Sequence, residues 1–128
     1  IGVSANLVFP CSNSFRFLNI QLKNLDKYTA IEVEVIDSSR QRRKLQFTNS
    51  QSKVRITKAS VSMPLKLSKG WNHLSLDLDK LLNAAFGTGL RKSLCVQLFA
   101  SIRLRRVYFS ARQYSDVELP VHLRTLGK

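Results

Sequence analysis

Cysteine, histidine and long apolar runs are scarce in this chain, and each scarcity removes a class of protein. Among 128 residues there are two cysteines and two histidines, well separated in sequence. That spacing indicates neither a disulfide framework nor a regular metal site, and we expect Cys11 and Cys95 to be buried free thiols. No run of about eighteen apolar residues is present, which excludes a membrane-spanning helix.

Sequence motifs of catalysis are also missing. The chain has no Gly-x-Ser-x-Gly elbow, no phosphate-binding loop, no Gly-x-Gly-x-x-Gly and no His-x-x-x-His. Asp77 and Asp79 have the spacing of one strand face, but we interpret Asp79 as a helix cap and Asp77 as an outward polar residue. We therefore expect no enzymatic activity and no cofactor.

Positive charge is what the chain has in excess. Lysine and arginine number 21 against 8 acidic residues, a net charge of +13. A field of this sign favours acidic partners: nucleic acid, an anionic membrane or an acidic protein surface. The cations gather in three clusters: a predicted hairpin tip (Arg40, Arg42, Arg43, Lys44), a strand stripe (Lys53, Arg55, Lys58) and a C-terminal group (Arg103, Arg105, Arg106, with Arg91 and Lys92 upstream).

Hydrophobic alternation with a period of two runs through most of the chain and predicts short strands. The predicted strands cover 3–9, 17–23, 30–36, 44–48, 53–57, 61–67, 71–78, 93–101 and a last one from 102. A short helix is predicted over 80–86, closed by Gly87. Strands 30–36 and 44–48 form a predicted hairpin, in which Glu32 and Glu34 can meet Arg43 or Lys44. This pattern is typical of an all-β fold, an antiparallel β-sandwich or jelly roll with one short helix.

The last predicted strand changes phase midway. Ile102 and Leu104 share one face, whereas Val107 and Phe109 share the other. A slip of one residue predicts a β-bulge or a sharp twist near Arg105 and Arg106. After this strand, Ser and Glu at 115 and 118 form a capping box that predicts a final helical turn.

Several separated motifs resemble those of the cilia- and flagella-associated protein 20 family. They are Lys23-Asn24-Leu25-x-Lys27-Tyr28, Glu32-Val33-x-Val35-x-Asp37, Arg42-Arg43, Ser62-Met63-Pro64-x-x-Leu67, Gly70-Trp71-Asn72, Ala85-Phe86-Gly87-Thr88, and Arg105-Arg106-Val107-Tyr108-Phe109-Ser110-x-Arg112-x-Tyr114-Ser115-x-x-Glu118-Leu119-Pro120. The resemblance runs from about residue 18 to 123.

The resemblance implies a jelly-roll-like sandwich in residues 1–128, a single domain that lacks strands found earlier in family members. It also implies a structural role in the axoneme of cilia or flagella, with the centriole or basal body as a further location. Family members bridge tubulin protofilaments at the doublet inner junction, so the implied partners are α/β-tubulin and other inner-junction proteins, with no membrane. From charge and expected exposure we predict partner contacts at Arg40, Arg42, Arg43, Lys44, Arg103, Arg105 and Arg112.

Nucleic acid is the alternative partner. Basic patches can neutralise phosphates, and Tyr28, Tyr108 or Tyr114 can stack on bases if they are exposed. Against this reading, the arginines are not interleaved with aromatics on one evident face, and most aromatic residues occupy predicted inward positions.

Overall fold

A computed structural model describes residues 2–3, 6–25, 27–100 and 102–111, which form strands, short turns and one helix. The elements are β1 (Gly2–Val3), β2 (Asn6–Asn13), β3 (Phe17–Asn24), β4 (Thr29–Asp37), β5 (Arg42–Thr48), β6 (Arg55–Ile56), β7 (Ser60–Pro64), β8 (Gly70–Asp77), α1 (Leu78–Phe86), β9 (Leu90–Ala100) and β10 (Ile102–Ser110). The predicted final helical turn lies outside the described residues.

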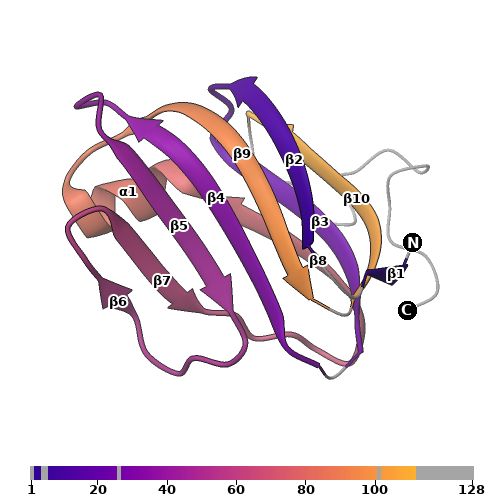
Figure 1. Cartoon of the computed structure of the whole chain (residues 1–128). Coiled ribbons are helices and arrows are strands. Elements are labelled where there is room, and N and C mark those ends of the chain that lie inside the picture. The colour runs from indigo at the N-terminus through magenta and orange to yellow at the C-terminus, as the bar shows by residue number, and fades with distance from the viewer. Residues whose placement is uncertain (1, 4–5, 26, 101, 112–128) are drawn as a thin grey trace.

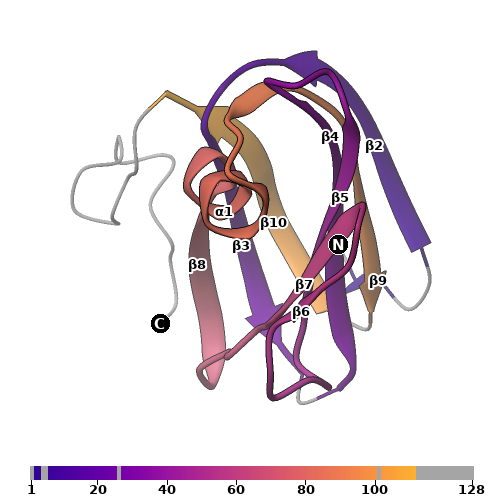
Figure 2. The same cartoon turned by 90° about the vertical axis from the view of Figure 1, so that its left-hand side faces the viewer.

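The strands form two sheets that face each other. The smaller sheet has the order β1-β10-β3-β8, and the larger has the order β2-β9-β4-β5-β7-β6. Figure 1 shows the larger sheet in front, and Figure 2 shows the two layers from the side. Neighbouring strands are antiparallel except β5 and β7, which run parallel. The predicted all-β sandwich is confirmed, and the parallel pair is a feature that the sequence did not predict.

The core lies between the sheets and follows the predicted alternation. In β4, Ile31, Val33 and Val35 are fully buried, while Glu32 and Glu34 between them are only half-buried. Aliphatic side chains of β3, β5 and β9 extend this core: Leu18, Ile20, Leu22, Leu45, Val96 and Leu98. Burying one such side chain contributes about 1.5–3 kcal/mol, so this layer is the main force holding the sheets together.

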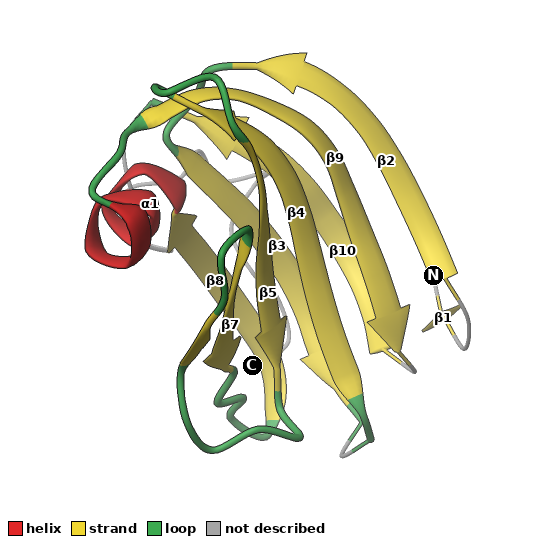
Figure 3. Ribbon diagram, turned by 60° about the vertical axis from the view of Figure 1, so that its left-hand side comes forward, coloured by secondary structure: helices red, strands yellow, loops and turns green. Residues whose placement is uncertain are grey.

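Helix α1 covers one side of the sandwich where β8 ends (Figure 3). Leu78 and Leu82 are its buried residues, one turn apart on the same face. The prediction that Asp79 caps the helix was wrong: the helix begins earlier, and the Asp77 carboxylate accepts from the Lys80 backbone N–H at 3.0 Å. Gly87 closes the helix as predicted, with a φ of 68° and a hydrogen bond from its N–H to the Asn83 carbonyl.

Several strands have bounds that differ from the prediction, β2 and β6 clearly so, and the bulge is confirmed. β2 continues through Pro10 to Asn13, because β2 is one of the two edge strands of its sheet and proline needs no ladder donor there. β6 spans only Arg55–Ile56 instead of 53–57. In β10 the register against β3 shifts between Leu104 and Arg106, so Arg105 is the bulged residue.

Candidate protein-binding surface

The carboxylates of the described residues are all engaged within the molecule. The shortest nitrogen–oxygen distances of the ion pairs are 2.6 Å for Arg16–Asp77, 2.8 Å for Arg43–Asp37, 3.0 Å for Arg42–Glu34 and 3.3 Å for Lys44–Glu32. Asp79 instead accepts from the backbone N–H of Leu90 at 2.7 Å. Internal contacts therefore engage the carboxylates of the described residues, and the excess of lysine and arginine leaves the surface strongly positive.

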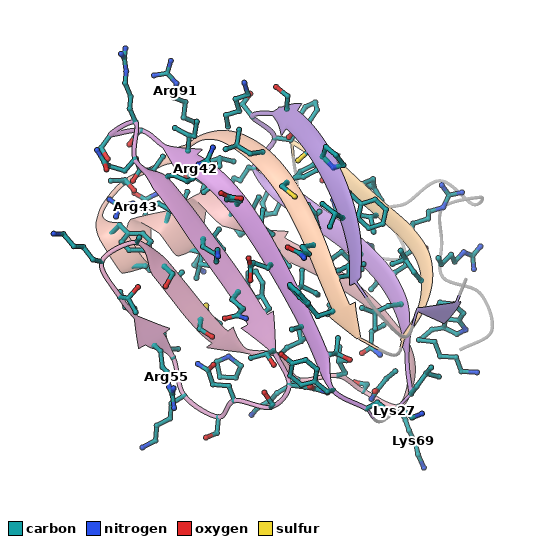
Figure 4. All side chains as sticks on the ribbon, in the orientation of Figure 1. Lys27, Arg42, Arg43, Arg55, Lys69 and Arg91 are labelled. Atoms are coloured by element: carbon teal, nitrogen blue, oxygen red, sulfur yellow. The ribbon has the colours of Figure 1, made fainter. Side chains whose placement is uncertain are left out.

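Many exposed cations make no ion pair with the described residues. They are Lys27, Arg40, Lys53, Arg55, Lys58, Lys66, Lys69, Lys80, Arg91 and Lys92. Figure 4 shows that those it labels lie at different places: Arg91 at one end of the sandwich, Lys27 and Lys69 at the other, and Arg55 beside β6. The positive surface is thus divided among separate regions.

The first region is the end cluster, which we define as Arg40, Arg42, Arg91 and Lys92. The β4–β5 turn and the start of β9 meet here, because Ser38 N–H donates to the Gly89 carbonyl at 2.8 Å. Ile36 of β4 lies in register with Lys92 of β9 on one side and with Arg42 of β5 on the other. Arg91 and Lys92 line a hollow of about 240 Å³ with residues 12–14. The two chain segments, remote in sequence, thus form one basic end.

Arg43, predicted at the exposed hairpin tip, points into the molecule instead. Its side chain is 15% exposed, and its Nε donates to the fully buried Asp37 carboxylate at 2.8 Å. The guanidinium lies 4.2 Å from the centre of the Phe86 ring, and Nη1 donates to the Lys58 carbonyl at 2.6 Å. The alternation of side chains along the strand already indicated this inward orientation, since Arg43 shares a face with the inward-pointing Leu45. We therefore assign Arg43 a structural role.

Asp37 organises the turn below the end cluster. Burial alone raises the pKa of its carboxyl, but hydrogen bonds from Ser39, Arg43 and Gln41 outweigh burial and hold that pKa far below its usual range. The two bonds from Ser39 measure 3.0 and 2.7 Å, and the Gln41 backbone N–H donates at 2.9 Å. The turn brings Arg40 into a left-handed conformation with φ at 65°. Its side chain is exposed.

Asp77 combines an ion pair with its capping role. Burial raises its pKa, but hydrogen bonds from Arg16 and from the Lys80 backbone N–H lower the pKa further than burial raises it. Both nitrogens Nε and Nη2 of Arg16 donate to the carboxylate, at 2.7 and 2.6 Å. This fork geometry joins the start of β3 to the start of α1.

The second region is the opposite-end pair, Lys27 and Lys69. The loop after β3 and the loop before β8 lie together, since the Asn24 side chain donates to the Ser68 carbonyl at 3.3 Å. Asn49 also donates to the Lys27 carbonyl at 2.8 Å. β4 joins this end to the end cluster, and its nine residues span roughly 30 Å.

The third region is the β6 arm, which we define as residues 51–59. Lys53, Arg55 and Lys58 are exposed there. Lys44, the remaining predicted tip residue, is exposed on β5, which β7 separates from β6, and pairs with Glu32, as predicted. Glu34 pairs with Arg42.

The predicted contact residues of the C-terminal group are only partly described. Arg105, at the bulge, is half-buried and lines an apolar hollow of about 580 Å³ with residues of β2, β9 and β10. Arg103 belongs to β10, but its side chain is not among those described, and Arg112 lies outside the described residues. The structure therefore does not bring Arg105 together with the other regions.

The outer face of the smaller sheet holds a buried polar network that the sequence did not predict. Asn19 is fully buried; its Nδ2 donates to the Ser110 hydroxyl at 2.8 Å, and its Oδ1 accepts from Ser75 at 2.8 Å. The Tyr108 hydroxyl lies 3.4 Å from Nε2 of His73. Tyr108 is thus half-buried beside this polar network rather than on an open stacking face.

Neither a metal centre nor a membrane helix is found in the described part of the chain. No group of three or more histidine, cysteine or acidic side chains there could hold a metal ion. No described helix is long and apolar enough to cross a bilayer.

A β-sandwich with several separate cationic regions and internally paired carboxylates defines a class of small basic all-β domains. The model of the CFA20 domain family matches residues 13–126. The chain belongs to this family. The family assignment agrees with the resemblance found in the sequence motifs.

Curated relatives carry the name cilia- and flagella-associated protein 20. The protein of Chlamydomonas reinhardtii is 40% identical over 108 residues, which cover 84% of this chain and 57% of that protein. The protein of Paramecium tetraurelia is 41% identical over 104 residues, 81% of this chain and 54% of that protein. The Caenorhabditis elegans protein is 34% identical over 108 residues, 84% of this chain and 53% of that protein. The chain spans about half the length of these relatives.

Proposed function

We propose that this domain is a structural module of cilia and flagella that binds acidic protein surfaces, with tubulin of the axonemal doublet as the main partner. The names of the relatives support the ciliary setting. The observation that carries the binding role is the division of charge: internal pairs engage the described carboxylates, while exposed cations gather in separate regions.

The positions of these regions suit a bridge. The end cluster and the opposite-end pair are separated by the length of β4, roughly 30 Å, which is too far for one small acidic loop to cover. The sandwich between them has a fully buried core, so the spacing is fixed. We infer that the domain joins neighbouring protofilaments, as at the doublet inner junction, and contacts other proteins there. This role needs no catalysis.

The test is co-sedimentation with taxol-stabilised microtubules over a series of salt concentrations, with duplex and single-stranded nucleic acid as competitors. We expect binding that weakens as salt rises but survives competition at physiological salt. The triple variant Arg40→Gln, Arg91→Gln, Lys92→Gln should bind more weakly. Lys80→Gln, an exposed cation outside the three regions, serves as the matched control and should bind like the parent chain.

Two outcomes would argue against the proposal. Stoichiometric nucleic acid that abolishes binding, together with a steep salt dependence, would favour the nucleic-acid alternative. Failure to bind either closed microtubules or open tubulin sheets, which expose the lumenal surface, would remove tubulin as the partner.

A further inference from the structure

β6 forms an open, cationic edge of the larger sheet. It is the terminal strand in the order β2-β9-β4-β5-β7-β6, and in the described structure only β7 pairs with it (Figure 1). Val54 and Ile56 are 52% and 55% exposed, which is unusual for aliphatic residues beside a sheet. The edge thus combines a strand side that no described strand pairs with and exposed apolar side chains.

The backbone of this edge faces outward at alternate residues. The Thr57 N–H donates to the Ser60 carbonyl at 2.8 Å, so Thr57 points toward the β7 side. Because successive residues of a strand point their backbone groups in opposite directions, the N–H and C=O groups of Ile56, the last residue of β6, point away from β7. These are the groups that an added strand would pair with.

The side chains alternate in chemistry as well. Arg55 pairs in register with Ser62, on the solvent face of the sheet, while Ile56 pairs with the buried Val61 on the core face. A strand laid along β6 would therefore meet cations on one face and aliphatic groups on the other. Residues 50–55 also line a hollow of about 410 Å³ that can receive a side chain of the added strand.

The β6 arm is already held in place at both ends. The Gln51 side chain exchanges hydrogen bonds with Ser62, at 2.7 Å to its hydroxyl and 3.2 Å to its carbonyl. At the other end, Arg43 donates to the Lys58 carbonyl at 2.6 Å. A partner would thus pair with a preorganised edge and would not bear the entropy of ordering it.

We propose that the β6 edge binds an extended segment of a partner protein in which acidic and aliphatic residues alternate, and which adds a strand to the larger sheet. Charge complementarity selects this occupant: Lys53, Arg55 and Lys58 form no ion pair with any described residue and favour carboxylates. A second copy of this chain would bring cations against cations, so self-pairing is opposed. The proposal goes beyond tubulin binding by the two ends of the sandwich.

The probe is a fluorescent synthetic peptide of about eight residues in which glutamate and valine alternate, the length of an ordinary strand. Its control is a block peptide of the same composition, with all glutamates first. Fluorescence anisotropy with the intact chain at physiological salt should show roughly tenfold tighter binding of the alternating peptide, because only that peptide presents the two faces together.

Three variants separate strand addition from simple charge attraction. The arm variant Lys53→Gln, Arg55→Gln, Lys58→Gln should lose about tenfold or more in affinity. Ile56→Pro keeps every charge but removes an outward donor, and should also lose roughly tenfold. The charge-matched triple Arg40→Gln, Arg91→Gln, Lys92→Gln in the end cluster should bind the peptide within about twofold of the parent.

Equal binding of the block peptide, or unchanged affinity of Ile56→Pro, would overturn the proposal, as would an equal loss in the end-cluster variant. Urea unfolding of each variant checks that the fold is kept. Slower hydrogen exchange of the Ile56 amide on peptide binding is a second test, which needs no variant. The result is independent of tubulin binding: the arm variant should still co-sediment with microtubules like the parent chain, whereas the end-cluster variant should co-sediment more weakly.

Discussion

Arg42 and Arg43 are neighbours of the same type, yet the structure predicts very different consequences for losing each. Arg43→Met removes the guanidinium that pairs with the fully buried Asp37. Arg42→Met removes a side chain that is 68% exposed and pairs with Glu34 at 3.0 Å. Methionine keeps most of the aliphatic length in both cases, so the comparison isolates the charge and its hydrogen bonds.

The expected magnitudes follow from burial. Breaking one member of a buried ion pair costs about 3–5 kcal/mol, and we expect the lower figure because Asp37 keeps its hydrogen bonds from Ser39 and Gln41. Loss of the Arg43–Phe86 contact adds about 0.5–1 kcal/mol. Arg42→Met should cost less than about 1 kcal/mol, as an exposed pair does.

Urea unfolding followed by circular dichroism measures the difference. With a slope of about 1–3 kcal/mol per M, the summed loss of about 3.5–4 kcal/mol lowers the midpoint by roughly 1–4 M. Asp37→Asn combined with Arg43→Met should cost less than the sum of the single changes, with a coupling of about 0.5–3 kcal/mol. If Arg43→Met is no more damaging than Arg42→Met, the structural role of Arg43 is refuted.

Further predictions concern pH, the helix end and the thiols. Because the pKa values of Asp37 and Asp77 are lowered in the folded chain, their stabilisation is present at neutral pH and is lost as the pH falls below about 4. Urea midpoints measured between neutral and acid pH should show this fall, and Asp37→Asn should flatten it; equal slopes would contradict the prediction. Gly87→Ala should lower stability by about 1 kcal/mol because φ is 68°, with Gly87→Asn costing less, and calorimetry that ranks them the other way would count against the cap. Burial raises the pKa of both Cys11 and Cys95, so thiol labelling should be slower than for a free cysteine until urea is added, and fast labelling of the folded chain would show the thiols to be open.

Local sequence patterns predicted much of the fold. The alternation of Ile31, Val33 and Val35 predicted β4, because one face of a sheet strand is buried and the other is not. The phase change around Arg105 predicted the bulge, and Gly87 predicted the helix end. The start of the helix was missed, because Asp77 and Asp79 are both suitable caps and only the fold shows which backbone amide each one reaches.

The candidate surface was less predictable. The sequence located the cations of the end cluster and of the β6 arm but grouped Arg43 with its exposed neighbours, although strand alternation placed it on the core face. It gave no sign that Arg91 would join Arg42 at one end of the sandwich, because their segments meet only through β4 and β9 (Figure 4).

The sequence by itself determined the all-β class, the faces of the central strands and the large excess of positive charge. Each follows from composition or from a repeat of two residues, which neighbouring positions along the chain already specify. Only the tertiary structure decided which cations remain exposed, that β5 and β7 run parallel, and that β6 is an open edge. Such features depend on contacts between residues far apart in sequence, as in the ion pair between Arg16 and Asp77. A local pattern contains no information about which distant side chain will neutralise a given charge.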